Sequence, residues 1–302
     1  MRVTSYKLDL TEPIARSLRF IIALLPLFAA AAYAGTLEDA SNAVSQQNYQ
    51  QAIRLLSGGG AKSLPETLLL GRAYFRIGQF EKAESAFERA VALDPKSSSA
   101  RNWLGRAQGM RADQANPFSA LGLARKARDS FEAAVKLDPK NLEAVSDLFS
   151  FYMSAPGFLG GGVEKARALA ETVKSLDAAE YATLQGEIAE KGNDYAAAEK
   201  FYLAAQAQAP KSVGRWIDLA KFYMRRGMTA KADSSLAKAK SIAPGAPRLL
   251  FDEASLLVRA NRNLKSARDL LAKYKVSSRR DEDPSPFEVE QLLAKLEKLD
   301  KK

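Results

Sequence analysis

The sequence predicts an all-α protein, a right-handed α-solenoid of about seven helical hairpins followed by a C-terminal capping helix. The first observation behind this prediction is a recurring pattern of small and large residues along most of the chain. The second is that each repeat carries two apolar stripes of helical period, separated by a glycine or asparagine turn. The third is the composition of the 302 residues, 47% hydrophobic and 26% charged, which is typical of a globular chain and unlike a disordered one.

The N-terminal residues 1–34 have the pattern of a secretory signal peptide. A polar start with four basic residues precedes the apolar run 20–32, and the run ends in Ala32-Tyr33-Ala34. We therefore expect cleavage after Ala34 and a periplasmic or secreted protein. The run is shorter than the roughly 20 residues of a transmembrane helix, so no stable membrane insertion is expected after cleavage. Because Asp9 and Glu12 lie in the polar start, an uncleaved anchor is the alternative.

The composition excludes several classes of site. The chain contains no cysteine and no histidine, which excludes disulfides, Cys/His zinc sites, thiol nucleophiles and Ser-His catalytic pairs. The composition does not exclude a metal or catalytic site built from carboxylates alone. No cofactor is predicted. The net charge of +10 is spread along the chain rather than gathered in a basic arm, so no nucleic-acid partner is predicted.

Two segments of the chain share one motif with identical internal spacing. The first contains Leu70, Gly71, Tyr74, Gly78, Ala83, Phe87, Ala90 and Pro95, and the second Leu219, Ala220, Tyr223, Gly227, Ala232, Leu236, Ala239 and Pro244. Small residues permit two antiparallel helices to cross closely, large ones fill the gaps beside them, and proline ends the unit. The order and spacing resemble the tetratricopeptide repeat (TPR) family, whose period is about 34 residues. The resemblance covers residues 36 to 275 and implies stacked hairpins without specifying a function.

The small residue of each second helix marks the hairpins. These residues are Ala52, Ala83, Ala127, Ala166, Ala198, Ala232 and Ala267. The predicted hairpins are 36–57, 64–97, 98–140, 141–177, 179–212, 213–246 and 247–275. After a charged break in the linker, Ser285 and Glu288 form a capping-box pattern, and a helix at 286–298 is expected to seal the last hairpin. The predicted domains are thus 1–34, the solenoid 35–275, and the linker with its capping helix, 276–302.

Two insertions lengthen the third and fourth hairpins, near 112–122 and 155–162. The crossing pair is 12 residues apart in regular units but 22 apart from Gly105 to Ala127 and 17 apart from Phe149 to Ala166. We interpret the insertions as neighbouring loops. Phe118, Leu121, Phe158 and Leu159 are candidate docking residues there, and the favoured interpretation packs Phe158 against residues 117–121 and leaves Leu159 on an exposed rim. The glycines at 160–162 lack the lysine of a phosphate-binding loop.

The first helix of each hairpin carries a stripe that faces away from its partner helix and is expected to line the concave groove of the solenoid. The candidate protein-binding residues on this stripe are Leu68, Arg72, Phe75, Arg76, Asn102, Arg106, Lys221 and Arg225. Arginine next to phenylalanine suits a peptide-binding strip. The Lys/Asn/Arg set with which some TPR proteins bind a C-terminal carboxylate is not found in full, so binding of chaperone tails is not predicted.

The predicted function is an exported, non-enzymatic scaffold of a bacterial cell envelope that binds protein or peptide segments through its groove, its insertions or both. A membrane-anchored scaffold with an uncleaved N-terminal segment is one alternative. An enzyme with an all-carboxylate or Lys/Tyr site is another, and a cleft with several carboxylates of raised pKa would support it. Carbohydrate contact through groove aromatics is a further alternative.

Overall fold

The computed structural model describes residues 36–58 and 63–301. Within these residues the chain forms helices and turns and contains no strand. The predicted signal peptide lies outside the described residues. No helix in the described part of the chain is both long and apolar enough to cross a membrane.

The described helices pair in chain order into seven hairpins, which confirms the predicted α-solenoid. The first three hairpins pair residues 36–45 with α2 (Tyr49–Gly58), α3 (Leu64–Arg76) with α4 (Phe80–Leu93), and α5 (Ser98–Gln114) with α6 (Pro117–Leu137). The other four pair α7 (Leu142–Ser154) with α8 (Val163–Val173), α9 (Ala178–Lys191) with α10 (Tyr195–Gln208), α11 (Val213–Arg225) with α12 (Thr229–Ile242), and α13 (Pro247–Arg259) with α14 (Leu264–Val276). Helix α15 (Pro286–Asp300) follows.

Each hairpin packs through the small and large residues of the repeated motif. The ring of Phe87 is fully buried and lies so close to Gly71 that a Cβ there would be 2.5 Å from a ring carbon. Phe131 covers Gly105 in the same way, at 2.7 Å. Since the interiors of proteins are close-packed, glycine is the residue that lets these helices approach. The repeated spacing in the sequence therefore reports a repeated helix crossing.

The insertion near 112–122 is helical, so its interpretation as a loop is wrong. It lengthens α5 to 17 residues and α6 to 21, against 13 and 14 in α3 and α4. Only Ala115 and Asn116 separate the two helices. The Asn116 side chain accepts hydrogen bonds from the backbone of Phe118 and Ser119, and Pro117 stands at the first helical position. These residues start a new helix as soon as the previous one ends.

The second insertion contains a single 3-10 turn, η1 (Gly157–Leu159), before α8 begins. Gly160 then adopts a φ of 91°, a left-handed conformation that glycine accepts readily. At Gly161 a Cβ would lie 1.8 Å from the carbonyl oxygen of Ala155. The glycines therefore permit a tight return of the chain onto the end of α7, which accounts for them without a bound phosphate.

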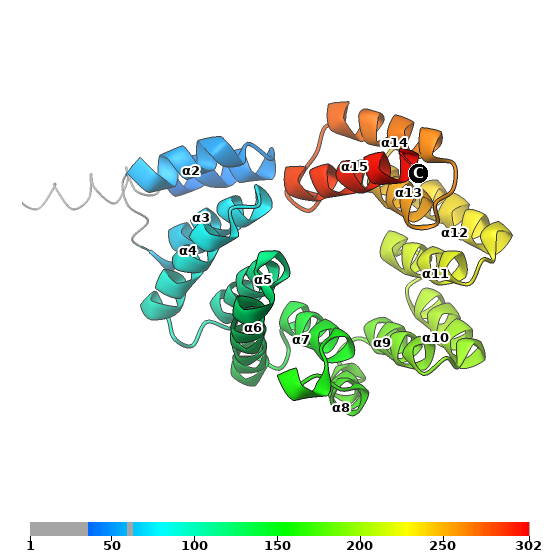
Figure 1. Cartoon of the computed structure of the whole chain (residues 1–302), viewed down its shortest axis with the longest axis horizontal. Helices are drawn as coiled ribbons and strands as arrows, with labels where there is room; N and C mark the ends of the chain where they lie inside the picture. Colours follow the sequence, from blue (N-terminus) through cyan, green and yellow to red (C-terminus); the bar gives the residue numbers. More distant parts are fainter. Residues whose placement is uncertain (1–35, 59–62, 302) are drawn as a thin grey trace, which may run out of the picture.

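The solenoid curves until its two ends meet. The odd-numbered helices from α3 to α13 lie on the inner side of the curve, and α15, in red, ends up beside α2 and α3, in blue and cyan (Figure 1). Leu292 and Leu296 of α15 are buried in one cluster with Ala254, Val258 and Leu271 of the last hairpin. Helix α15 thus covers the last hairpin with one face, while its N-terminal end reaches the first hairpins.

Candidate protein-binding groove

Charged side chains connect neighbouring helices along the inner side of the solenoid. Arg106 of α5 forms ion pairs with Asp147 and Glu143 of α7, at 2.6 Å for Glu143, and Asn102 donates a hydrogen bond to Asp147. Burial raises the pKa of Asp147 above its usual value, and the ion pair with Arg106 partly offsets this. Farther along, Arg215 of α11 pairs with Glu180 of α9. These contacts hold the inner helices in register.

An apolar cleft of about 750 Å³ opens between α3, α5, α6, α7 and the start of α15. The side chains of Phe75, Phe80, Trp103, Met110, Phe131, Phe151 and Phe287 contribute to its lining. The rings of Phe75 and Trp103 meet edge to face, with their centroids 5.5 Å apart. Arg106 lies over the Trp103 ring at 4.6 Å from the centroid, which brings a cation to the rim of the cleft.

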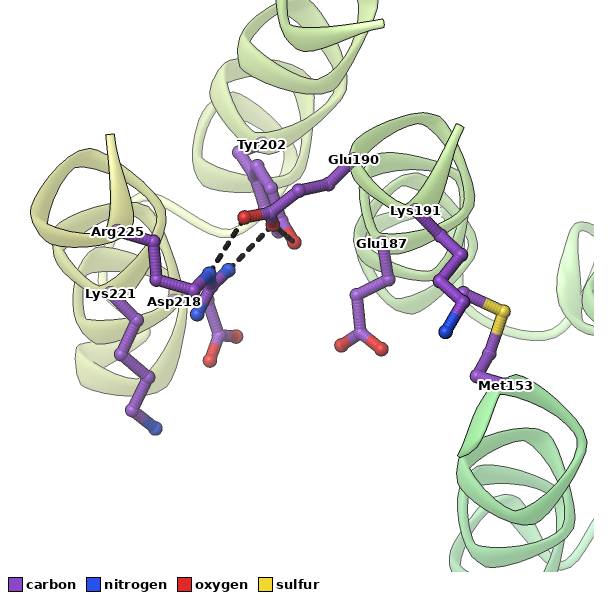
Figure 2. A pocket seen from close by; sticks show the side chains of 8 residues that line it. All are labelled: Met153, Glu187, Glu190, Lys191, Tyr202, Asp218, Lys221 and Arg225. Atoms are coloured by element: carbon purple, nitrogen blue, oxygen red, sulfur yellow. Dashed lines mark hydrogen bonds and ion pairs between the residues drawn. The ribbon is translucent and has the colours of Figure 1, made fainter. Parts of the chain in front are cut away.

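A second, charged pocket of about 430 Å³ lies between α9 and α11 (Figure 2). Glu190 and Arg225 face each other across it and form two hydrogen bonds, of 2.6 and 2.7 Å. Glu187 points into the same pocket, between Asp218 and Lys191 (Figure 2). Burial, aided by the negative charges of Asp218 and Glu180, raises the pKa of Glu187 to about 7. The pocket therefore holds a carboxyl group that titrates near neutral pH.

The sequence matches the TPR family model, described as "Tetratricopeptide repeat", over residues 68–108 and 161–213. The first segment covers most of α3, all of α4 and part of α5, and the second covers α8, α9 and α10. The chain is a tetratricopeptide repeat protein.

Solved structures of TPR proteins resemble the fold of this one. A TPR protein of Parabacteroides merdae aligns with a TM-score of 0.54 and 13% identity, covering 88% of this chain and 99% of that chain. A thermophilic TPR protein of Thermus thermophilus aligns with a TM-score of 0.50 and 23% identity, covering 65% of this chain and 100% of that chain. At sequence identities this low, the structural similarity shows a shared fold and not a shared function. No curated protein matches the sequence.

In this TPR protein the predicted groove residues lie on the inner helices, but several already have partners. Arg72 and Arg76 of α3 bind Asp281 in the segment before α15. Asn102 is buried, and Arg106 and Arg225 are engaged in ion pairs with neighbouring inner helices. Phe75 lines the apolar cleft and Lys221 the charged pocket. Leu68 packs against the core cluster around Phe87. Their role in binding a partner stays a prediction.

The favoured packing of the two insertions is wrong. Phe158 is 70% exposed and Phe118 is 92% exposed, so the two rings do not pack into a common core. Leu159, expected on an exposed rim, is instead buried and lines the apolar cleft. Residues 157–159 form a 3-10 turn, whose side chains leave the backbone in different directions. Phe118, Leu121 and Phe158 stay predicted docking residues on the outside of the molecule.

Sequence reasoning missed the residues that complete the groove from elsewhere in the chain. Trp103, at the centre of the aromatic cleft, follows a serine-rich helix start and stands outside the stripe assigned to α5. The sequence pattern places Asp281 in the predicted linker and Phe287 in the predicted capping helix. The acidic run at 281–283 opposite the inner arginines was the one signal that pointed to this contact.

Proposed function

We propose that this TPR protein is an exported, non-catalytic scaffold of a bacterial cell envelope and binds extended segments of other proteins on its inner side. The observation that carries the proposal is the aromatic cleft with charged residues at its rim. Its volume of about 750 Å³ lies in the range that accommodates ligands of several side chains. TPR repeats in general present such inner surfaces to protein partners.

The chemistry of the cleft favours a peptide over a small polar ligand. Phe75, Trp103 and Phe151 provide a desolvated surface of the kind that binds an apolar anchor residue. Arg76, Arg106 and Asp147 stand at its edge, where they can pair with polar groups flanking the anchor. An apolar centre with a polar rim is the arrangement of a protein interface.

A partner capture tests this proposal. We would compare the wild-type chain from residue 35 with a Ser150→Trp variant as baits in a bacterial envelope extract. Ser150 is exposed and lines the cleft, so the indole would fill the cleft without disturbing the core. The control is Ser234→Trp, at an exposed position of α12 outside the cleft and the insertions. We expect Ser150→Trp alone to lose at least about tenfold of the captured partner. Equal capture by all three baits would refute the groove as the binding site.

Export rests on the sequence of residues 1–34. A polar start, a short apolar run and Ala32-Tyr33-Ala34 support cleavage by a signal peptidase. The competing proposal keeps the segment as a membrane anchor. N-terminal sequencing of the protein from fractionated cells separates the two, because cleavage exposes Gly35 as the first residue. Recovery of an intact N-terminus in the membrane fraction would favour the anchored form.

The raised carboxyl pKa values are the observation that favours an enzyme as a second candidate. Burial raises the pKa of Glu187 to about 7 and also raises the pKa values of Asp218 and Asp252. Lys221 and Arg215 neutralise part of the charge of Asp218, which is what a structural ion network requires. We therefore favour a protein-binding function for this chain over an enzymatic one. Glycosidase or amidase activity on envelope polymers that disappears in Glu187→Gln would support the enzyme instead.

A further inference from the structure

We propose that residues 280–288, here called the C-terminal strap, occupy the N-terminal end of the groove as an intramolecular ligand. The proposal rests on the groove-binding function above and specifies its partner. The same surface, around Arg72, Arg76 and Phe80, would bind an acidic segment with a downstream aromatic residue from a partner protein. Such a segment would exchange with the strap.

The carboxylate of Asp281 is the centre of the polar half of this contact. It pairs with Arg72 and with Arg76, whose Nε lies 3.5 Å from Oδ1, and it accepts a hydrogen bond from the Tyr49 hydroxyl at 3.3 Å. Arg76 also donates to the backbone carbonyl of Asp281, at 2.6 Å. The Gln47 side chain donates to the carbonyl of Arg280, at 2.8 Å. The strap is thus bound by backbone and side chain, as a peptide ligand would be.

Phe287 is the centre of the apolar half of the contact between the strap and the groove. Its ring meets the ring of Phe80 edge to face, with centroids 5.0 Å apart, and it lies over Gly78, where a Cβ would come within 2.5 Å of the ring. The ring also forms one wall of the aromatic cleft. The buried face of α15 uses Val289, Leu292 and Leu296 instead. Phe287 therefore makes the apolar contact between the start of α15 and the first hairpins.

Hydrogen bonds within the C-terminal region hold the strap in the conformation that contacts the groove. The Tyr274 hydroxyl donates to the carbonyl of Pro284 at 2.5 Å, and the Arg280 backbone donates to the Asp283 carboxylate at 2.8 Å. Ser285 and Glu288 form a capping box. A segment that is already ordered loses little entropy on docking, so it can cover the groove and still be released as a unit.

The polar contact leaves donors unsatisfied. Nε of Arg72 is buried and finds no hydrogen-bond acceptor among the described residues, and the buried Nε of Arg76 meets Oδ1 of Asp281 only as an ion pair at 3.5 Å, without hydrogen-bond geometry. The Asp281 carboxylate is shared by two guanidinium groups and a phenol, and the second carboxylate of the strap, that of Glu288, reaches Arg76 only as a longer ion pair of 3.6 Å. A ligand with two neighbouring carboxylates would satisfy these donors better, since buried donors without partners are costly. This gives an acidic partner segment an advantage over the strap.

The decisive experiment measures access to the groove with a labelled peptide. The probe is a fluorescein-labelled peptide with the sequence of residues 280–289, added to the wild-type full-length mature chain and to an Asp281→Lys/Phe287→Ala variant whose strap is weakened. We expect the variant to bind the probe at least about tenfold more tightly than the wild type, with the affinity decreasing as salt is added. Probes with Asp281→Ala or Phe287→Ala should bind more weakly.

Two further pairs of substitutions show where on the protein the labelled peptide binds. Adding Arg72→Glu/Arg76→Glu to the weakened-strap variant should abolish probe binding, whereas adding Arg125→Glu/Lys126→Glu on the exposed side of α6 should not. If the double strap variant is poorly folded by circular dichroism, Phe287→Ala alone gives the same comparison. Equal probe binding by wild type and variant, no binding by the variant, or binding that survives Arg72→Glu/Arg76→Glu would each overturn the proposal. Probe exchange does not depend on export or on capture from an extract, so its failure is distinct from failure of the proposed function.

Discussion

Replacing Gly105 by alanine should destabilise the protein, whereas the same change at Gly109, one turn away in α5, should stabilise it. Glycine in a helix interior costs roughly 0.5–1 kcal/mol relative to alanine, so both variants gain this amount. At Gly105 the new Cβ would lie 2.7 Å from two ring carbons of the buried Phe131. At Gly109 the structure places nothing within 4 Å of it.

The magnitudes follow from the two contributions. Overpacking a close-packed site costs about 1–3 kcal/mol, which exceeds the gain in helix propensity. We therefore expect Gly105→Ala to lose about 0.5–2 kcal/mol and Gly109→Ala to gain about 0.5–1 kcal/mol. Urea unfolding followed by helical circular dichroism measures both, provided that the denaturant slope is unchanged. If Gly105→Ala proves as stable as Gly109→Ala, the helices do not cross as closely as the repeat spacing requires.

Three further predictions concern the insertion, the charged pocket and the cap. Phe158→Asp should change the free energy of unfolding by less than about 0.5 kcal/mol because the ring is exposed, whereas Leu159→Asp should cost several kcal/mol; equal thermal shifts would contradict this burial pattern. The raised pKa of Glu187, about 7, means that the folded state holds this proton more tightly than the unfolded one. Wild-type stability should therefore decrease by up to about 3 kcal/mol as the pH rises from 4.5 to 7, and urea titrations of Glu187→Gln should lack this part of the slope. Leu296→Asp in the buried face of α15 should increase hydrogen exchange in α13 and α14 and leave α9 and α10 protected; uniform loss of protection would argue against nearest-neighbour stacking.

The repeat pattern predicts the hairpins well because its causes are local. Gly71 and Phe87 belong to the same hairpin, and their contact depends only on helix geometry and on a short turn. The capping box of Ser285 and Glu288 spans three residues and forms as expected. Inner-face arginines such as Arg76 follow from the same helical periodicity. Their orientation toward the groove is therefore readable from the sequence.

The insertions show where local reasoning reaches its limit. Extra residues between two helices can form a loop or lengthen the helices, and the sequence near Asn116 is compatible with both. The choice depends on whether the longer helices find neighbours to pack on, as α5 and α6 do by packing directly against each other. The exposure of Phe158 and the burial of Leu159 likewise depend on how a 3-10 turn lies against α7 and α6.

By itself the sequence determined the helical hairpins, their number and the inner stripe, because each depends on residues within one repeat or its neighbour. Only the tertiary structure decided that Asp281 reaches Arg72 and Arg76 and that Glu187 titrates near neutral pH. The first depends on curvature, since a small rotation at each hairpin accumulates over the solenoid until residues about two hundred positions apart meet. The second depends on burial in a pocket lined by side chains from four different helices. Neither the summed curvature nor the solvent exposure of one carboxyl group is encoded in any short stretch of residues.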